Sequence, residues 1–272
     1  MAYKVGMVSL GCSKNQVDAE IMLALIQENG FELCADAEQC DVVIINTCGF
    51  IEDAKKESIE TILEFCQMKA EGKIKVVVVT GCLAERYQKE VALEIPEADV
   101  VLGIGCNGEI VKAIKQALAG ERVVSFADKT LMPLSGNRVL ANAPFFAYVK
   151  LADGCNNRCA FCAIPLIRGD FRSRPMEDVL DEVKRLAAQG VKEVNVVAQD
   201  TTRYGDDLYG GWCCPNFCGR SAKSMASAGC ASCTATPTES PTSFWRSWPR
   251  RRRSSNMWMC PSSTPAGRSS GP

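Results

Sequence analysis

The first 129 residues alternate between short runs rich in β-branched residues and longer stretches with a helical spacing of apolar residues. Such alternation favours a mostly parallel sheet with helices on both faces, because parallel strands are joined by crossover helices. We therefore predict an α/β fold whose N-terminal domain, residues 1–129, is a Rossmann-like parallel-sheet domain. The predicted strands are 4–10, 41–46, 73–80 and 99–102, and the predicted helices are 15–28, 51–68, 84–93 and 108–119.

Three cysteines fall at equivalent places in this pattern. Cys12, Cys48 and Cys82 each come at the end of a predicted strand and directly before a predicted helix. The carboxyl ends of parallel strands form the crevice in which α/β proteins bind ligands, and helix N-termini favour thiolate. The three thiols could therefore converge as ligands of an iron–sulfur cluster with one open iron. Alternatively they are packing residues, which is a common role of cysteine.

A second group of cysteines follows the apolar run 145–151. Cys155, Cys159 and Cys162 have the spacing C-x3-C-x2-C. Three thiolates on one loop can hold three irons of a four-iron cluster and leave the fourth iron without a protein ligand. The alternative is a zinc knuckle or a set of structural thiols, although zinc sites usually pair one C-x2-C with a second pair. The chain contains no histidine, which excludes a Cys-His zinc site and catalysis by Ser-His-Asp or Cys-His groups.

The other cysteines bear on the compartment. The chain has 16 cysteines, and its N-terminus leads directly into the first predicted strand rather than into a signal peptide. No apolar run approaches the roughly 18 residues that a membrane span needs. We therefore expect a cytoplasmic protein with reduced thiols, and neither a membrane nor DNA as a partner. The cysteines at positions 34, 40, 66 and 106 are expected to be packing or incidental residues.

Four motifs resemble those of one enzyme family. The spacing of Cys155, Cys159 and Cys162 is similar to the signature of radical S-adenosylmethionine (SAM) enzymes. Together the motifs resemble the radical SAM methylthiotransferases over about residues 3–210, and within them the branch that modifies ribosomal proteins. The motifs are Val-Ser-Leu-Gly-Cys-Ser-Lys-Asn at 8–15, Asn-Thr-Cys-Gly-Phe-Ile at 46–51, Thr-Gly-Cys-Leu-Ala at 80–84, and the Cys155 loop.

The resemblance implies a reaction and its cofactors. It implies SAM and two 4Fe-4S clusters, a SAM-binding one on Cys155, Cys159 and Cys162 and an auxiliary one on Cys12, Cys48 and Cys82. The implied reaction adds a methylthio group to the β-carbon of an aspartate in a small-subunit ribosomal protein, with a flavodoxin or ferredoxin type electron donor. No side chain is predicted to be catalytic, because clusters and cofactor perform the bond breaking. Two alternatives are a transfer-RNA adenosine methylthiotransferase and a non-catalytic metal-binding protein associated with RNA.

The residues after the first domain predict the start of a second one. Residues 130–144 read as a linker, and residues 145–211 as an incomplete radical SAM domain. A strand at 147–151, the cysteine loop, a helix at 176–190 and a strand at 191–198 form a β–loop–α–β unit. In the resembling family this unit is the first repeat of an open (βα)6 partial barrel.

Two further residues are candidate cofactor contacts. Phe161 is similar to the family's aromatic residue that packs near the adenine of SAM, and its alternative role is ordinary loop packing. Gln199 follows the last predicted strand, where polar residues of barrel enzymes commonly face the active site. Arg168, Arg172 and Arg174 could bind a carboxylate or phosphate in bidentate fashion, or could be solvated loop residues.

Residues 212–272 differ in character from the rest of the chain. They contain no Ile, Leu or Val, and they carry a basic run at 250–253. Such a segment lacks the apolar content that a core requires. A basic RNA-binding tail is one interpretation, and a zinc ribbon of Cys214, Cys218, Cys230 and Cys233 is another. A third interpretation is translation in a shifted reading frame.

The genetic code favours the shifted frame. Methionine and tryptophan have one codon each, so residues 257–259 fix the nucleotides ATGTGGATG, and the next cysteine codon adds TG. Read from the third base, these nucleotides encode Val-Asp-Val, which is strand-like. We therefore expect an out-of-frame, disordered tail and a half-built barrel with residues 191–198 as an unprotected edge. We also expect this chain to be inactive as it stands.

Overall fold

The structure, a computed structural model, describes residues 2–141, 143–211 and 229–233, the last of these by backbone only. The chain divides into two compact units. The first comprises Met1–Ala143 and Ala152–Arg174, and the second comprises Pro144–Leu151 and the residues from Pro175 onward. The loop that carries Cys155, Cys159 and Cys162 therefore clusters with the N-terminal sheet.

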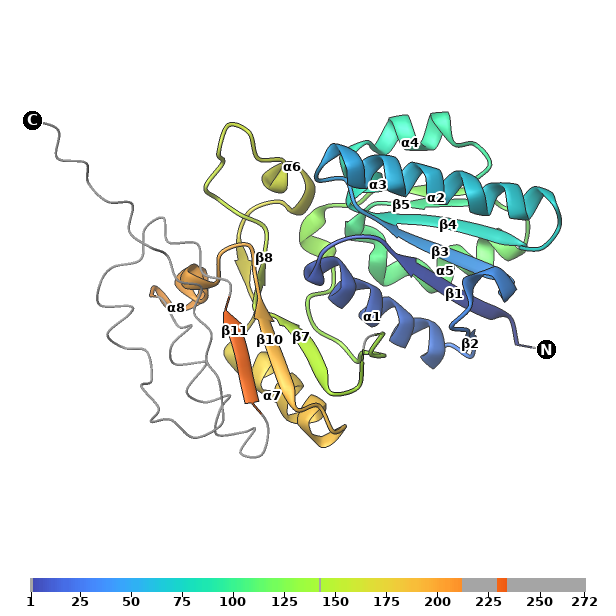
Figure 1. Cartoon of the computed structure of the whole chain (residues 1–272). Helices are drawn as coiled ribbons and strands as arrows, with labels where there is room; N and C mark the ends of the chain where they lie inside the picture. Colours follow the sequence, from blue (N-terminus) through green and yellow to red (C-terminus); the bar gives the residue numbers. More distant parts are fainter. Residues whose placement is uncertain (1, 142, 212–228, 234–272) are drawn as a thin grey trace, which may run out of the picture. The chain divides into compact units, whose positions relative to one another are not determined.

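The first unit is built around a parallel sheet of six strands in the order β2-β1-β3-β4-β5-β6 (Figure 1). The central strands β3 and β4 are buried along their whole length, and their Val-rich sequences suit a sheet covered on both faces. The strands are β1 (Lys4–Ser9), β2 (Glu32–Leu33), β3 (Val42–Thr47), β4 (Val76–Gly81), β5 (Val100–Leu102) and β6 (Val123–Ser125).

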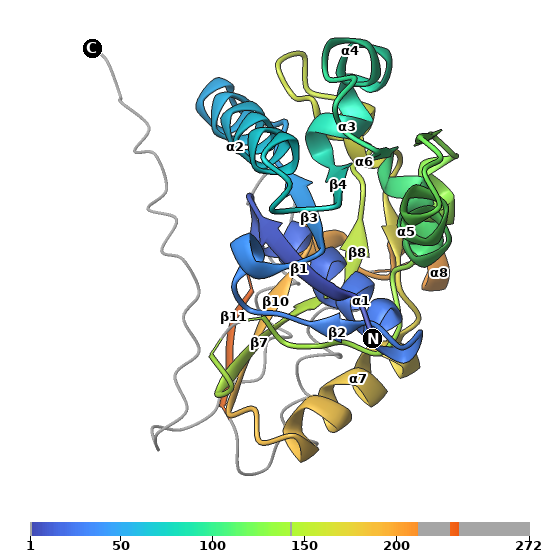
Figure 2. The same ribbon diagram turned by 90° about the vertical axis from the view of Figure 1, so that its right-hand side faces the viewer.

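Helices cover both faces of this sheet (Figure 2). Successive side chains of a strand point to opposite faces, so Ile44 packs with the core under α1 and α5, and Ile45 packs with the core under α2, α3 and α4. The predicted α/β class and parallel N-terminal sheet are confirmed. The helices are α1 (Ser13–Glu28), α2 (Glu52–Ala70), α3 (Cys82–Arg86), α4 (Gln88–Glu94) and α5 (Ile110–Leu118), with 3-10 turns η1 (Ala37–Gln39), η2 (Ile104–Glu109) and η3 (Lys129–Leu131).

The elements differ from the prediction in three places. The short strands β2 and β6 were not predicted, because two or three residues carry no readable periodicity. The helix predicted at 84–93 is two helices, broken at Tyr87 where φ is −118° and ψ is 34°. The remaining strands and helices of this unit lie within a few residues of their predicted bounds.

The first unit also contains the segment 152–174. Strand β8 (Ala152–Asp153) pairs antiparallel with β9 (Arg172–Ser173), and the helix α6 (Ile164–Arg168) lies between them in the chain. The pairing of Ala152 with Ser173 closes the base of the cysteine-bearing loop. The two ends of this loop are therefore held together by main-chain pairing alone, without a metal.

The second unit contains the predicted β–α–β repeat. Its parallel sheet has the order β11-β10-β7, and the helix α7 buries Val179, Leu180, Val183 and Leu186 as its spacing predicts. The elements are β7 (Phe146–Lys150), α7 (Met176–Ala188), β10 (Glu193–Val197), η4 (Thr201–Arg203), α8 (Asp206–Tyr209) and β11 (Gly229–Cys233).

One prediction about this sheet is wrong. Residues 191–198 were expected to form an unprotected edge, but β10 has β7 on one side and β11 on the other. An open strand edge presents main-chain donors and acceptors that pair with any extended segment, whatever its side chains. Of the proposed zinc-ribbon cysteines, Cys214 and Cys218 lie outside the described residues. Among the described residues, no helix is long and apolar enough to cross a membrane.

Candidate metal centres

The first cysteine trio lies at the carboxyl ends of three neighbouring strands. Cys12 follows β1 and is the N-cap of α1, Cys48 follows β3 directly, and Cys82 is the first residue of α3 after β4. Strand β3 pairs with β1 on one side and β4 on the other. Parallel pairing in this register therefore brings the three cysteine-bearing loops to one edge of the sheet, as the sequence predicts.

Glycines allow the three loops to approach closely. A Cβ placed on Gly11 would lie 3.5 Å from the Cβ of Cys48, and a Cβ on Gly49 would lie 2.8 Å from the carbonyl oxygen of Cys82. The second distance is shorter than real Cβ contacts, so any larger residue at position 49 would displace the Cys82 loop. The glycines beside Cys12 and Cys48 thus keep the trio together.

Two buried asparagines hold this edge. The Asn15 amide donates to the carbonyl oxygens of Leu10 at 3.2 Å and Thr47 at 3.1 Å, and the Asn46 amide donates to the carbonyl oxygen of Asn15 at 2.9 Å. These bonds tie the Cys12 loop to the end of β3. Both asparagines belong to the cysteine-containing motifs, but nothing in those motifs predicts that their side chains hold the loops together.

The Cys48 loop has its own anchor in α2. The Ser58 hydroxyl accepts a hydrogen bond from the Cys48 backbone N–H at 3.0 Å and donates to the Cys48 carbonyl oxygen at 3.1 Å. The Arg86 guanidinium donates to the carbonyl oxygen of Gly49 at 2.9 Å. Both polar backbone groups of Cys48 are therefore satisfied without the thiol, which leaves that thiol available as a ligand.

The three thiols differ in exposure. Cys12 is exposed, Cys48 is half-buried, and Cys82 is buried. Burial raises the pKa of the Cys82 thiol, and the positive charge of Arg168 opposes that rise. The nearby Cys12 thiol adds a smaller upward contribution to the Cys82 pKa. A bound cation would favour the thiolate at this position, since coordinating thiols are deprotonated.

The second trio lies on a loop with a constrained backbone. The Cys155 N–H donates to the Gly169 carbonyl oxygen at 3.1 Å, and the Cys162 N–H donates to the Cys159 carbonyl oxygen at 3.0 Å. Arg158, between the first two cysteines, is the one non-glycine residue of the described chain with positive φ, at 47°. Strained backbone of this kind is concentrated at ligand sites.

The three cysteines of this loop differ in exposure, and its aromatic residue faces outward. Cys155 is buried, Cys162 is half-buried, and Cys159 is exposed. Phe161 is 94% exposed, so the alternative of ordinary loop packing is wrong for this side chain. An apolar side chain in that position is free to cover a bound molecule.

Arg168 connects the segment of the second trio to the first trio. Its guanidinium is buried and donates to Asp18 at 2.5 Å and to Asp153 at 3.1 Å. Its other terminal nitrogen lies 3.4 Å from the Cys82 sulfur. Ala163 and Ile167 pack with Cys82 in one apolar cluster. Ala163 adjoins Cys162, so the structure brings the two cysteine groups close together, which the sequence did not predict.

The chain is similar to known proteins in both of its cysteine-bearing parts. Residues 4–103 match the model described as "Uncharacterized protein family UPF0004", and residues 149–209 match the radical SAM superfamily. A protein of Pelotomaculum thermopropionicum named ribosomal protein uS12 methylthiotransferase RimO is 48% identical over 215 residues. A protein of Desulforamulus reducens with the same name is 51% identical over 208 residues. Over about three quarters of its length the chain is therefore similar to the radical SAM methylthiotransferases.

The match covers much of this chain but only part of its relatives. It includes 77% of the chain and 48% of the Pelotomaculum protein, and 76% of the chain and 47% of the Desulforamulus protein. The chain therefore spans about half the length of the curated relatives that it matches.

The chain shares its fold with a solved structure. That structure is the radical SAM methyltransferase TsrM of Kitasatospora setae, solved with cobalamin and a 4Fe-4S cluster bound, and it superposes with a TM-score of 0.62. The two are 14% identical, and the match covers 91% of this chain and 57% of TsrM. At that identity the likeness shows the fold alone.

The donor chemistry of the two trios fits the iron–sulfur clusters of the radical SAM family. Among the described residues, no three Cys, Asp or Glu side chains are grouped closely enough to hold a single metal ion. A cube of four irons and four sulfides keeps its thiolate ligands farther apart than one ion does, and thiolates are its usual ligands. Close glycine contacts bring the loops of the first trio together, and backbone hydrogen bonds hold the loop of the second.

The remaining candidate residues are Gln199, which lies in the second unit, and the arginines, which lie in the first. Gln199 follows β10 in the second unit and is partly buried. Arg174 is buried and donates to Ser135 at 3.1 Å, while Arg172 donates to the carbonyl oxygens of Lys129 and Thr130. The interpretation of these arginines as solvated loop residues is wrong. Arg172 and Arg174, like Arg168, bind groups of the first unit itself.

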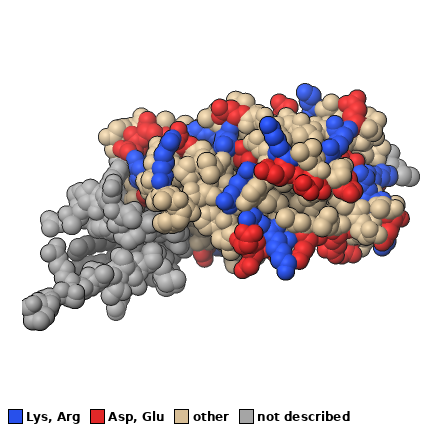
Figure 3. Space-filling view, turned by 90° about the horizontal axis from the view of Figure 1, so that it is seen from above, with Lys and Arg blue, Asp and Glu red and all other residues tan. Residues whose placement is uncertain are grey.

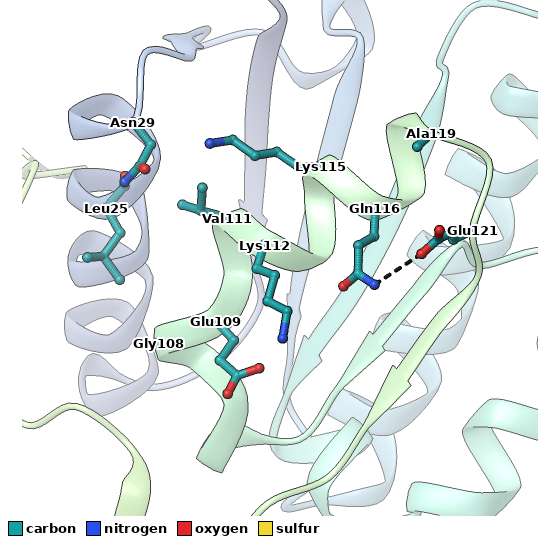
Figure 4. A pocket seen from close by; sticks show the side chains of 10 residues that line it. All are labelled: Leu25, Asn29, Gly108, Glu109, Val111, Lys112, Lys115, Gln116, Ala119 and Glu121. Atoms are coloured by element: carbon teal, nitrogen blue, oxygen red, sulfur yellow. Dashed lines mark hydrogen bonds between the residues drawn. The ribbon is translucent and has the colours of Figure 1, made fainter.

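Other surface features lie away from both trios. A groove of about 720 Å³ between α1 and α5 is lined by Leu25, Val111, Lys112 and Gln116, among others (Figure 4). None of the predicted site residues lines it. The face drawn in Figure 3 intersperses basic and acidic side chains over the described residues, with no large area of one sign.

Proposed function

We propose that the family activity of this chain is a radical SAM methylthiotransferase reaction. The reaction adds a methylthio group to the β-carbon of an aspartate in a small-subunit ribosomal protein. One observation carries the proposal: both cysteine trios lie in one compact unit, joined through Cys82. The names of the matching relatives, ribosomal protein uS12 methylthiotransferases, support the substrate class.

The six cysteines are the proposed ligands of two 4Fe-4S clusters. Cys155, Cys159 and Cys162 would hold the cluster that binds SAM, and Cys12, Cys48 and Cys82 an auxiliary cluster. When bound, these groups supply reductive cleavage of SAM to a carbon radical, together with the sulfur and the methyl group of the product. Each trio leaves one iron without a protein ligand, which is the requirement for binding a small molecule there.

The protein's own residues would orient these groups and limit access of water. The exposed Phe161 would lie against the adenine of SAM, and Gln199 would contribute a polar contact to the same cofactor. Asn15, Asn46 and Ser58 hold the Cys12 and Cys48 loops through hydrogen bonds. A rigid ligand set lowers the reorganisation that accompanies each electron transfer, so the chain's contribution is positioning.

The proposed partners follow from the reaction. A flavodoxin or ferredoxin type donor would deliver electrons to the Cys155 cluster, because SAM cleavage consumes one electron. The exposed Cys159 side of the loop is the accessible approach within the first unit. A cytoplasmic location is proposed, where thiols remain reduced and ribosomal proteins are made.

Iron analysis tests the proposal directly. Chain rebuilt anaerobically with iron and sulfide should contain about eight irons per polypeptide, the number for two cubes. Bound zinc without iron would support a non-catalytic metal-binding protein instead. Material that stays colourless and free of iron would overturn the proposal.

Residues 212–272 are proposed to be translated out of frame, so that this polypeptide itself does not turn over. Sequencing the gene around codon 211 decides the cause. If the corrected frame restores the matching sequence, the longer product should be assayed with the ribosomal protein and with transfer RNA. Mass spectrometry should find the methylthio group on an aspartate of the protein, whereas modified adenosine would identify the transfer-RNA branch. Product formed by the 272-residue chain would contradict the predicted inactivity.

A further inference from the structure

Arg168 contacts the auxiliary trio although it comes from the segment that carries the other trio. We propose that Arg168 is a positioning residue for the auxiliary cluster: it hydrogen-bonds the Cys82 thiolate and keeps the cluster's reduction potential higher than its carboxylate surroundings would allow. This inference rests on the proposed function, because it requires a cluster on Cys12, Cys48 and Cys82.

The geometry directs one end of the guanidinium at the sulfur. One terminal nitrogen of Arg168 binds Asp18 and Asp153, at 2.5 and 3.1 Å. The other terminal nitrogen lies 3.4 Å from the sulfur of Cys82, within the range of an N–H···S hydrogen bond. The same nitrogen lies 3.5 Å from the side-chain amide oxygen of Asn15. The two carboxylates therefore fix the orientation of the fork that reaches Cys82.

The surroundings prevent Arg168 from turning away. The side chain is 4% exposed, and Asp18 and Asp153 are 3% and 1% exposed. Ile167, the preceding residue, packs with Cys82 in the apolar cluster. A guanidinium held by two buried carboxylates loses little conformational freedom when it binds a third acceptor. The flexible ammonium of a lysine would lose more.

The charges determine the sign of the effect. Reduction of a cluster adds negative charge, so a nearby cation stabilises the reduced state and nearby carboxylates destabilise it. Hydrogen bonds to the cluster sulfurs and the net local charge are the established determinants of its potential. Asp18 and Asp153 together carry two negative charges beside Cys82, and Arg168 is the cation between them and the sulfur. Its removal should lower the potential of the auxiliary cluster.

The test compares substitutions of opposite expected sign in the full 272-residue chain. A Cys155→Ala background leaves the auxiliary cluster alone, and its midpoint potential is followed by redox titration with electron paramagnetic resonance. Arg168→Gln should lower the potential, and Arg168→Lys should lower it less. Asp18→Asn and Asp153→Asn should raise it. Arg172→Gln removes a positive charge whose hydrogen bonds go to the carbonyl oxygens of Thr130, Lys129 and Met132 rather than to Cys82, and it should leave the potential unchanged.

The design separates tuning from a purely structural role. A structural role predicts changes of the same direction in all four ion-pair variants, with parallel losses of iron. If Arg168→Gln fails to fold, Arg168→Lys and the two Asp→Asn variants still give opposite signs under the proposal. An unchanged potential with full iron content overturns the role of Arg168 alone. An iron-free Cys155→Ala chain overturns the auxiliary cluster, and with it the proposed function.

Discussion

Asn15 illustrates at the residue scale how one buried amide can stabilise the sheet edge that carries Cys12, Cys48 and Cys82. Its amide nitrogen donates to the carbonyl oxygens of Leu10, which follows β1, and of Thr47, the last residue of β3. Asn15→Ala should lower the free energy of unfolding by about 1–3 kcal/mol, because buried acceptors lose their donor. Urea denaturation measures this change. Asn29→Ala, at the exposed end of the same helix with one hydrogen bond to Leu25, is the matched control.

The outcome that contradicts this prediction is equal stability of the two variants. Equal losses would mean that water replaces Asn15 at the strand ends without cost. The comparison is informative because both changes remove an asparagine, one within α1 and one at its C-cap, while only Asn15 is buried.

Cys66 has a pH-dependent effect at the same scale. Burial, and less strongly the charge of Glu97, raises the pKa of its thiol from 9.0 to about 11. The folded chain therefore keeps this proton between those pH values while the unfolded chain releases it. The stabilisation is complete below pH 9.0 and is lost as the pH rises toward 11. Unfolding by urea at several pH values should show a flatter decline for Cys66→Ala than for the unsubstituted chain.

A matched substitution separates titration from packing. Met68→Leu changes apolar packing on the same helix without removing an ionisable group, and it should keep the decline of the unsubstituted chain. A decline in Cys66→Ala as steep as in Met68→Leu would show that Cys66 does not titrate in this range. The buried positions of Cys40, Cys66 and Cys106 in the two cores confirm the expectation that these cysteines are packing residues.

The residue scale also shows where sequence reasoning ended. The cysteines were identifiable because their spacing and their positions after strands are visible along the chain. The partners of Arg168 were not, since Asp18 lies 150 residues away and only the folded chain brings them together. An arginine six residues after a cysteine motif gives no signal of which carboxylate it will meet.

At the element scale, helix α2 anchors the loop that carries Cys48. It carries Ser58, whose hydroxyl binds both the N–H and the carbonyl oxygen of Cys48. Ser58→Ala should lower the free energy of unfolding by about 1–3 kcal/mol, since two buried backbone groups lose their partner. It should also reduce the iron held by the Cys12, Cys48 and Cys82 trio. Glu57→Ala, an exposed substitution on the same helix, should change neither quantity.

Calorimetric or urea unfolding measures the first effect, and iron content in a Cys155→Ala background measures the second. Stability lost with full iron retained would show that Ser58 supports the fold but not the site. Full stability with full iron would remove α2 from the list of elements that position Cys48.

Elements were predictable to the extent that they repeat a pattern. Long periodic segments such as α1, α2 and α7 were predicted within two residues of their observed starts and ends. The break between α3 and α4 was not, because neither proline nor glycine occurs at Tyr87. In the folded chain Tyr87 meets Lys55 of α2, whose ammonium lies over its ring and donates to its hydroxyl at 3.1 Å. Local sequence does not encode such contacts.

At the scale of the whole molecule, the parallel N-terminal sheet and the β–α–β repeat followed from alternation and spacing. The joining of the cysteine loop to the first unit did not, because residues 152–174 leave the second unit in sequence and return to it. Domain boundaries assigned from sequence order alone place a loop in the same domain as its sequence neighbours. Contacts place it with Cys82, Asp18 and Asn15 instead.

The two cysteine trios come from separate segments of the chain, so they can be removed one at a time. Cys12→Ala should remove the auxiliary cluster and retain the SAM cluster, and Cys155→Ala should do the reverse, because each trio has its own backbone support. Each variant should hold about half the iron of the unsubstituted chain. Electron paramagnetic resonance of the reduced proteins should show two different residual signals. The two signals should add up to the spectrum of the unsubstituted chain.

Cys34→Ala serves as the control, because Cys34 is half-buried and belongs to neither trio. It should retain all the iron and both signals. Loss of all iron in Cys12→Ala would show that the cluster on the Cys155 loop cannot be assembled without the auxiliary cluster. That result would place the coupling at Cys82, because its contacts with Arg168, Ala163 and Ile167 join the two segments. Identical residual signals in the two variants would contradict two separate sites.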